Sequence, residues 1–208
     1  MKFDAEFKKA IAELPTKEKD KLILRLLKKD PVLANQLYFQ LISNESVHDR
    51  RSKMEDRIIK EVKRATNTYY SPGYLLMDLR YISGEITDHV KTTKDKFGEA
   101  SLNLLMLGEV LKNNNERIKK ATLSQAHTFS LYVVARIFKI MILIKALHED
   151  YWVEFEDRLK ELAELIGDNP NLMQIAIHNG LDINWLYKEI PEDIVAIHKE
   201  IRSMGFLK

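Results

Sequence analysis

Apolar residues recur at every third or fourth position along almost the whole chain. A clear example is the row Leu75, Leu79, Ile82, Ile86 and Val90. With about 3.6 residues per helical turn, such a row lies on one face of an α-helix, where it can be buried. No stretch alternates apolar and polar residues in the way a half-buried strand does. The pattern therefore predicts an all-α fold.

Cap residues followed by proline mark the start of several helices. Asp30-Pro31, Ser71-Pro72 and Asn169-Pro170 each join a hydrogen-bond acceptor for the first turn to a proline whose missing N–H costs nothing there. We also expect Thr16 to cap a helix, and residues 113–115, three asparagines, to form a turn. The second predicted helix follows Thr16 and carries Leu22, Ile23, Leu26 and Leu27. The other predicted helices cover residues 4–14, 31–42, 46–66, 72–93, 98–111, 116–148 with an interruption at 122–124, 150–166, 170–178, 183–189 and 191–204.

These helices group into antiparallel hairpins that open near residues 31, 72, 122 and 170. The spacings of 41, 50 and 48 residues bracket the period of HEAT-type repeats, whose helix pairs stack into a solenoid. The units share no residue signature, and a compact multi-helix bundle accounts for the same helices. We expect one all-helical domain over residues 1–208, with a possible subdivision into N-terminal helices (1–45), basic central helices (46–148) and acidic C-terminal helices (149–208).

Composition favours a soluble protein. Hydrophobic residues make up 45% and charged residues 31% of the chain, and the absence of cysteine excludes disulfides and cysteine-based zinc or nucleophile chemistry. Residues 1–9 contain no apolar run of the kind found in a secretory signal. The most apolar segment, residues 129–144, includes Arg136 and Lys139 and is shorter than a bilayer span, so it predicts a buried helix. We expect a cytoplasmic protein that does not bind membranes.

Charge is segregated along the chain, although the formal net charge is only +2. Residues 1–65 hold 16 basic and 11 acidic residues, residues 66–148 hold 11 and 7, and residues 149–208 hold 6 and 13. A basic body with an acidic end suggests polyanion binding, internal charge matching or head-to-tail association.

Two rows of like charge carry this segregation, and each would line one helix face for about 21 Å. The basic stripe consists of Arg50, Lys53, Arg57, Lys60 and Arg64. The acidic stripe consists of Asp150, Glu154, Asp157, Glu161 and Glu164.

The basic stripe is open to three interpretations: a solvated helix face, a surface that meets an acidic protein segment in the same or another chain, or a nucleic-acid site. Cations about 5 Å apart could follow a phosphate backbone, and aromatic side chains beside them can stack on bases. The candidate aromatics are Tyr69, Tyr70 and Tyr74. Asp49, Asp56 and Glu61 at the edges of the stripe weigh against nucleic acid, as does a whole-chain pI of about 8.5.

The acidic stripe has two interpretations. It is either a solvated face or an interaction face that meets the basic stripe, within one chain or between copies. Exposed ion pairs are worth only about 0–1 kcal/mol each, so such a match would fix register more than strength. Homo-oligomers formed through the opposite-charge faces are therefore possible.

The sequence indicates no catalytic residue, cofactor or metal site. Glu85-x-x-Asp88 and Glu154-x-x-Asp157 could each place two carboxylates near a magnesium ion, but the additional acidic pair that helical pyrophosphatases need before Glu85 is missing. Glu45-x-x-His48 is the only Glu-x-x-His motif, where a di-iron bundle needs two. For Arg136 and Lys139 we expect structural pairing, with an anion-binding pocket as the alternative.

Our leading hypothesis is a non-catalytic helical scaffold or adaptor that presents charged helix faces to a protein partner. The alternatives are a nucleic-acid-binding helical protein that uses the basic stripe, and a magnesium-dependent phosphohydrolase.

Overall fold

The computed structural model describes residues 2–207, and within that range every regular element is a helix. This confirms the predicted all-α fold. The elements are α1 (Ala5–Glu13), α2 (Thr16–Leu27), α3 (Pro31–Leu41), α4 (Val47–Asn67), α5 (Pro72–Thr93), α6 (Lys96–Lys120), α7 (Leu123–Lys145), the 3₁₀ helix η1 (Glu149–Phe155), α8 (Glu156–Gly167), α9 (Pro170–His178), α10 (Asn184–Tyr187) and α11 (Ile194–Ser203).

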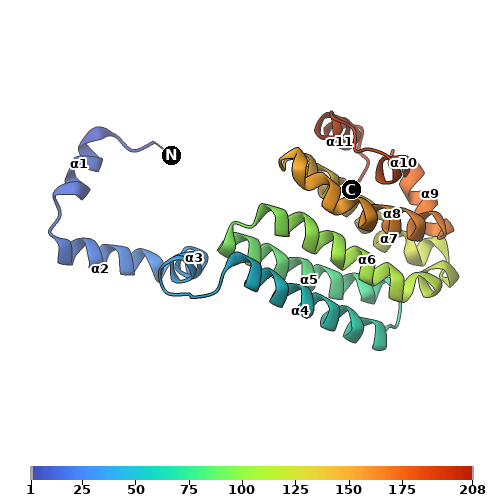
Figure 1. The fold of residues 1–208 in the computed structure, drawn as a ribbon, viewed down its shortest axis with the longest axis horizontal. Helices are drawn as coiled ribbons and strands as arrows, with labels where there is room; N and C mark the ends of the chain where they lie inside the picture. The colour runs from blue at the N-terminus through green and yellow to red at the C-terminus, as the bar shows by residue number, and fades with distance from the viewer. Residues whose placement is uncertain (1, 208) are drawn as a thin grey trace.

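Helices α4 to α9 stack in two layers (Figure 1). In one layer α4 contacts α6 and α6 contacts α8; in the other α5 contacts α7 and α7 contacts α9. Short connections join successive helices, except that η1 lies between α7 and α8, and neighbours along the chain cross from one layer to the other. Stacked hairpins of this kind occur in α-solenoids. The HEAT-type repeat remains a prediction, because the hairpins share no sequence signature.

Local sequence sets most helix starts as expected. The side chains of Asp30 and Ser71 accept hydrogen bonds from the first turns of α3 and α5, each of which opens with proline. Asn169 caps α9 through the backbone N–H groups of Asn171 and Leu172. The cap predicted at Thr16 is wrong: Pro15 is the extended residue before α2, and Thr16 is the first residue inside it.

The buried core runs from Met54 to Ile201. Its centre is α7, where Phe129, Phe138 and Ile140 are fully buried, as predicted for this segment. Among residues 2–207, α7 is also the one helix long and apolar enough to cross a membrane by composition, and half of its most apolar stretch is buried. It packs against α5, α6, α9 and α11, which is typical of an apolar helix in a protein core.

The predicted turn at residues 113–115 is wrong, because α6 continues unbroken to Lys120. The amide of Asn114 donates hydrogen bonds of 2.9 Å to the Val110 carbonyl and to the Thr66 hydroxyl. Asn115 is also buried and donates to the Leu165 carbonyl at 2.8 Å. Asparagine disfavours helix interiors because its side chain competes for backbone groups. Here the partners are in neighbouring turns and helices, so the helix keeps its hydrogen bonds.

The acidic helix predicted over residues 150–166 is divided. Residues 149–155 form η1, and the α-helix begins only at Glu156. Because a 3₁₀ helix has about three residues per turn, Asp150 and Glu154 leave the face shared by Asp157, Glu161 and Glu164. The acidic stripe is therefore continuous only along α8.

Helices α1, α2 and α3 form an arm that projects from the stacked helices (Figure 1). We call residues 2–42 the N-terminal arm. None of its three helices contains a buried residue. Helix α3 packs on the body, mainly against α5, where the Gln36 side chain donates a hydrogen bond to the Lys91 carbonyl at 2.5 Å.

Candidate interaction surfaces

The N-terminal end of the basic stripe is paired with a single carboxylate. Arg50 Nε donates to Glu45 Oε2 at 3.0 Å, and Lys53 forms an ion pair with the same carboxylate. The two cations lower the pKa of Glu45, Lys53 first and Arg50 second. The Arg50 guanidinium also lies 4.6 Å from the centroid of the Phe39 ring in α3. This end of the stripe therefore joins α4 to the base of the arm.

The rest of the stripe is paired mainly with carboxylates of α5. Arg57 Nε donates to Glu85 Oε2 at 2.9 Å, and this contact raises the pKa of the guanidinium. Arg64 donates to Glu61 and Asp78, both at 2.8 Å. These two partners raise the pKa of Arg64, Glu61 first. Because these carboxylates neutralise the arginines, a phosphate backbone would meet a smaller positive potential at this face.

Lys60 is the member of the stripe that makes no ion pair with any of residues 2–207. It is exposed and lies between Arg57 and Arg64 on α4. The structure thus brings four of the five predicted cations against carboxylates of the same chain, and these carboxylates are not those of the acidic stripe.

The acidic stripe meets other partners. Glu161 lies 3.5 Å from the Lys112 ammonium on α6, and Asp150 lies 3.1 Å from Nδ1 of His148. Asp157 and Glu164 are exposed on α8. Within the part of the chain that the structure describes, no member of this stripe pairs with a member of the basic stripe. The two stripes therefore do not meet inside one chain.

The three predicted tyrosines occupy two different environments. Tyr69 is half-buried under the Arg117 guanidinium, 5.2 Å from its ring centroid, and burial raises its pKa. Tyr70 and Tyr74 are 79% and 59% exposed and meet edge to face with centroids 5.2 Å apart. Tyr69 is thus a packing residue, whereas the other two are available for contacts.

Two further exposed residues extend this aromatic surface along α5. Met77 is 65% and Tyr81 58% exposed. Met77 and Tyr81 follow Tyr74 on α5 at helical spacing, so these three share one face. Tyr70 precedes α5 and joins this face through its ring contact with Tyr74, and we call the four residues the tyrosine row. The sequence analysis missed Met77 and Tyr81; their spacing of 3 and 7 residues from Tyr74 was the signal that could have found them.

The N-terminal arm exposes far more apolar surface than its length predicts. Of the 22 exposed large hydrophobic residues found among residues 2–207, eleven belong to the arm. They are Phe3, Phe7, Ile11, Ile23, Leu24, Leu26, Val32, Leu33, Tyr38, Leu41 and Ile42. Soluble monomers rarely expose contiguous apolar patches larger than a few hundred Å². The arm is therefore the strongest interaction candidate in this structure.

Helix α3 adds a separate argument. Apolar side chains surround it almost completely, a pattern typical of a helix covered on several sides. Its main packing partner is α5, while Leu41 remains 76% exposed and Tyr38 60% exposed. Its sequence therefore suits a helix with more neighbours than one chain supplies.

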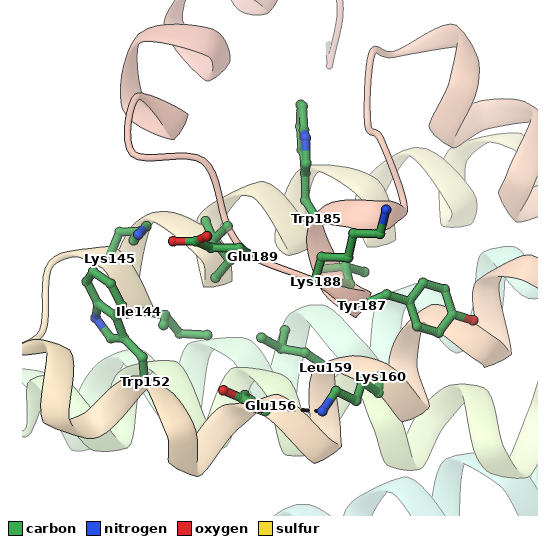
Figure 2. Close-up of a pocket in the computed structure, with 12 residues that line it drawn as sticks. Ile144, Lys145, Trp152, Glu156, Leu159, Lys160, Trp185, Tyr187, Lys188 and Glu189 are labelled. Carbon is green, nitrogen blue, oxygen red and sulfur yellow. Dashed lines mark hydrogen bonds and ion pairs between the residues drawn. The ribbon is translucent and has the colours of Figure 1, made fainter.

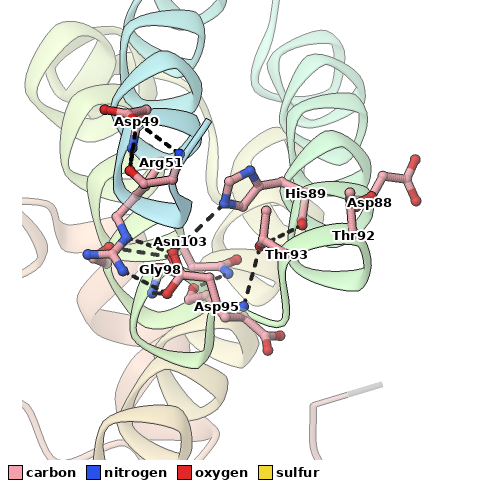
Figure 3. A network of polar contacts seen from close by, with 12 residues as sticks. Asp49, Arg51, Asp88, His89, Thr92, Thr93, Asp95, Gly98 and Asn103 are labelled. Carbon is pink, nitrogen blue, oxygen red and sulfur yellow. Dashed lines mark hydrogen bonds and ion pairs between the residues drawn. The ribbon is translucent and has the colours of Figure 1, made fainter. Parts of the chain in front are cut away.

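A cluster of polar side chains linked by short hydrogen bonds lies at the start of α6 (Figure 3). Arg51 donates two hydrogen bonds, of 2.7 and 2.8 Å, to the Asp95 carboxylate, which also accepts one from the Gly98 N–H at 2.8 Å. His89 Nε2 lies 3.9 Å from the same carboxylate. Burial opposes ionisation of Asp95, but His89, Arg51 and the Gly98 N–H together lower its pKa. The cluster ties α4 and α5 to the cap of α6, which is a structural role.

A cavity of about 330 Å³ lies where α7, α8 and α10 meet, and both tryptophans of the chain line it (Figure 2). The Lys145 ammonium lies 3.7 Å from the Trp152 ring centroid and pairs with Glu192. Lys160 pairs with Glu156 at 3.3 Å on the opposite wall. Because both cations and carboxylates line the cavity, its lining favours no single class of ligand.

The paired carboxylates considered for magnesium do not converge. Glu85 is held by Arg57, and Asp88 pairs with Lys91 at 3.5 Å. Residues 2–207 contain no group of three or more His, Asp or Glu side chains that could hold a metal ion.

Comparison with known proteins adds no identification: no family model, no curated protein and no solved structure matches this chain.

Proposed function

We propose that this chain is a non-catalytic helical scaffold that binds protein through its N-terminal arm, and that the partner is a second copy of the chain. The observation that carries the proposal is the arm itself, which exposes eleven large apolar side chains and buries none. Hydrophobic burial is the main driving force of protein association. The sequence predicts that the scaffold contacts its partner through charged helix faces. The proposal assigns that contact to the apolar N-terminal arm instead.

The size of the arm fits a stable dimer. Eleven side chains of about 150 Å² each, half exposed, offer on the order of 800 Å². A standard protein interface buries about 800 Å² on each partner. A partner that covered the arm would therefore bury an area sufficient for specific association.

The tyrosine row is the surface of the second copy that suits the arm best. Tyrosine and methionine are enriched at interface cores, and Arg57 and Arg64 lie beside the row on α4. The arm already packs on α5 through α3 within its own chain, so a second arm would extend an existing layer of contacts along the same helix. Reciprocal exchange would cover both arms and both rows, and would close the assembly as a twofold dimer.

Engineered cysteines test this arrangement, because the chain has none of its own. A tagged chain with Leu26→Cys is mixed with an untagged chain with Met77→Cys and treated with a short bifunctional thiol reagent. We expect a tagged–untagged cross-link. Gln174→Cys, on the exposed side of α9, is the matched control and should give none.

The pattern of cross-links distinguishes the alternatives. Links only between two Leu26→Cys chains would show that the arms bind each other and overturn the tyrosine row as the docking surface. Equal linking by Gln174→Cys, or no linking, would overturn assembly through the arm.

Nucleic-acid binding is supported less well. The exposed Tyr70 and Tyr74 favour it, but carboxylates already pair four of the five cations that would meet phosphate. A magnesium-dependent phosphohydrolase has no supporting geometry beyond the paired carboxylates of its sequence. A cytoplasmic location belongs to the scaffold proposal, and cell fractionation tests it.

A further inference from the structure

A basic groove lies along α7 on the side that faces α11, away from both the arm and the tyrosine row. Its volume is about 460 Å³, within the range of small-molecule sites. The residues of its lining that matter here are Arg136, Lys139, Ile142, Leu143, Arg202 and Leu207. No carboxylate is among its lining residues. This groove therefore differs in charge from the mixed cavity around Trp152.

Arg136 is the central cation of the groove, and neutral groups hold it. Its Nη1 donates to Asn103 Oδ1 at 3.0 Å, and its Nη2 donates to the Tyr132 hydroxyl at 2.7 Å. The guanidinium also stacks on the Tyr132 ring, 4.9 Å from the centroid. A half-buried cation usually has a carboxylate partner. Arg136 is thus fixed in place while its charge stays available to an anion.

Two further cations lie beside it. Arg202 in α11 is exposed and makes no ion pair with residues 2–207. Lys139 follows Arg136 on α7 and pairs with Glu99 at 2.8 Å. The excess positive charge of the groove therefore comes from Arg136 and Arg202. His198 of α11 also lines the groove, and burial, followed by the charge of Arg202, lowers its pKa.

The remainder of the lining is apolar and firmly positioned. Ile142 and Leu143 belong to α7, and Leu207 lies opposite on the C-terminal tail. The backbone N–H of Leu207 donates to Asn179 Oδ1 at 3.0 Å, which holds the tail in place. From Arg136 to Leu143 the helix rises about 10 Å. The groove therefore extends about that length, from a cationic end at Arg136 to an apolar end at Ile142 and Leu143.

We propose that this groove binds a small amphipathic anion, with a carboxylate or phosphate head between Arg136 and Arg202 and an apolar body along Ile142, Leu143 and Leu207. The head would complete the charge pairing of Arg136, because a guanidinium binds either oxyanion with charge-assisted hydrogen bonds. This site is independent of assembly through the arm.

Calorimetric titration with octanoate tests the proposal, since its extended length of about 10 Å matches the groove. Octylamine, with the same tail and a cationic head, and inorganic phosphate, with no tail, are the matched probes. We expect octanoate to bind and octylamine not to bind, with phosphate at least about tenfold weaker than octanoate because it makes no apolar contact. The proposal would be overturned if octanoate and octylamine bound equally well, or if phosphate bound as tightly as octanoate. It would also be overturned if octanoate did not bind at concentrations up to about 10 mM.

Two arginine variants locate the head. Arg202→Gln changes an exposed residue, so the fold should be kept, and we expect octanoate to bind about tenfold more weakly. Lys199→Gln removes the same charge from the same helix outside the groove and should change affinity less than about twofold. Arg136→Gln should abolish binding, with circular dichroism as the check on its fold. Equal effects of Arg202→Gln and Lys199→Gln would contradict the assigned site.

Discussion

The guanidinium of Arg51 in α4 forms a bidentate pair with the carboxylate of Asp95, through Nε to Oδ2 at 2.7 Å and Nη2 to Oδ1 at 2.8 Å. The Asp95 side chain is 4% exposed and also caps α6. The Arg51 guanidinium lies 4.6 Å from the Phe97 ring centroid as well. This contact therefore fixes the first turn of the longest helix against α4.

Removal of Arg51 should destabilise the protein strongly. Arg51→Ala leaves the Asp95 carboxylate buried without its cation, and losing one partner of a buried pair costs about 3–5 kcal/mol. Because Arg51 is 20% exposed, we expect about 3 kcal/mol by urea unfolding. Lys63→Ala, an exposed cation on the same helix, should cost less than about 0.5 kcal/mol. Equal midpoints for the two variants would contradict this role.

The same pair predicts an acid-dependent loss of stability. The folded-state pKa of Asp95 is lowered, so above about pH 4, the ordinary pKa of an aspartate, its ionised form stabilises the fold. As pH falls below about 4, the unfolded chain takes up this proton first, and stability decreases. Asp95→Asn should be less stable at pH 7 and lose less stability between about pH 4 and pH 2. Parallel curves for the variant and the wild type, from urea midpoints at each pH, would contradict the prediction.

Glycine at position 98 follows from the same geometry. A Cβ there would lie 2.1 Å from Asp95 Oδ2, while nothing lies within 4 Å of a Cβ at Gly108. Both residues are inside α6, where alanine is otherwise favoured by about 0.5–1 kcal/mol. We expect Gly108→Ala to raise the thermal midpoint and Gly98→Ala to lower it. Shifts of the same sign in the two variants would contradict this prediction, because they would show that the Asp95 carboxylate can move away from a Cβ at position 98.

Binding to polynucleotides should be weak, and its affinity should depend only shallowly on salt. If all five cations met phosphates, the logarithm of the binding constant would fall against the logarithm of salt concentration with a slope of about −3.5 to −4.5. With Lys60 alone the slope should be about −1 or shallower. Fluorescence anisotropy with a labelled oligonucleotide at several KCl concentrations measures this slope. A steep slope that Lys60→Glu and Arg57→Glu both remove would favour the nucleic-acid alternative instead.

Sequence was most informative where a signal is local. Asp30, Ser71 and Asn169 were predicted as caps because the acceptor and its N–H donors are within three residues of each other. Asn114 misled the turn prediction because its partner Thr66 lies 48 residues away, and no local pattern reports that hydrogen bond.

The interaction surfaces show the same limit. Helical spacing identified the basic stripe as one face of α4, but it could not show that Glu85 and Asp78 of α5 lie beside it. Helix α3 shows the same limit: its sequence is apolar on almost every side, yet Leu41 is exposed. An amphipathic pattern indicates that a face needs cover; it does not indicate whether the same chain provides it.

Sedimentation equilibrium of the intact chain tests the scaffold proposal most directly. We predict a mass of twice 24.3 kDa at micromolar concentration, and a return to 24.3 kDa when Leu26 and Leu41 are both replaced by glutamate. Both side chains are exposed, so this variant should keep its fold. A wild-type mass of 24.3 kDa at every concentration up to about 100 μM would contradict assembly through the N-terminal arm.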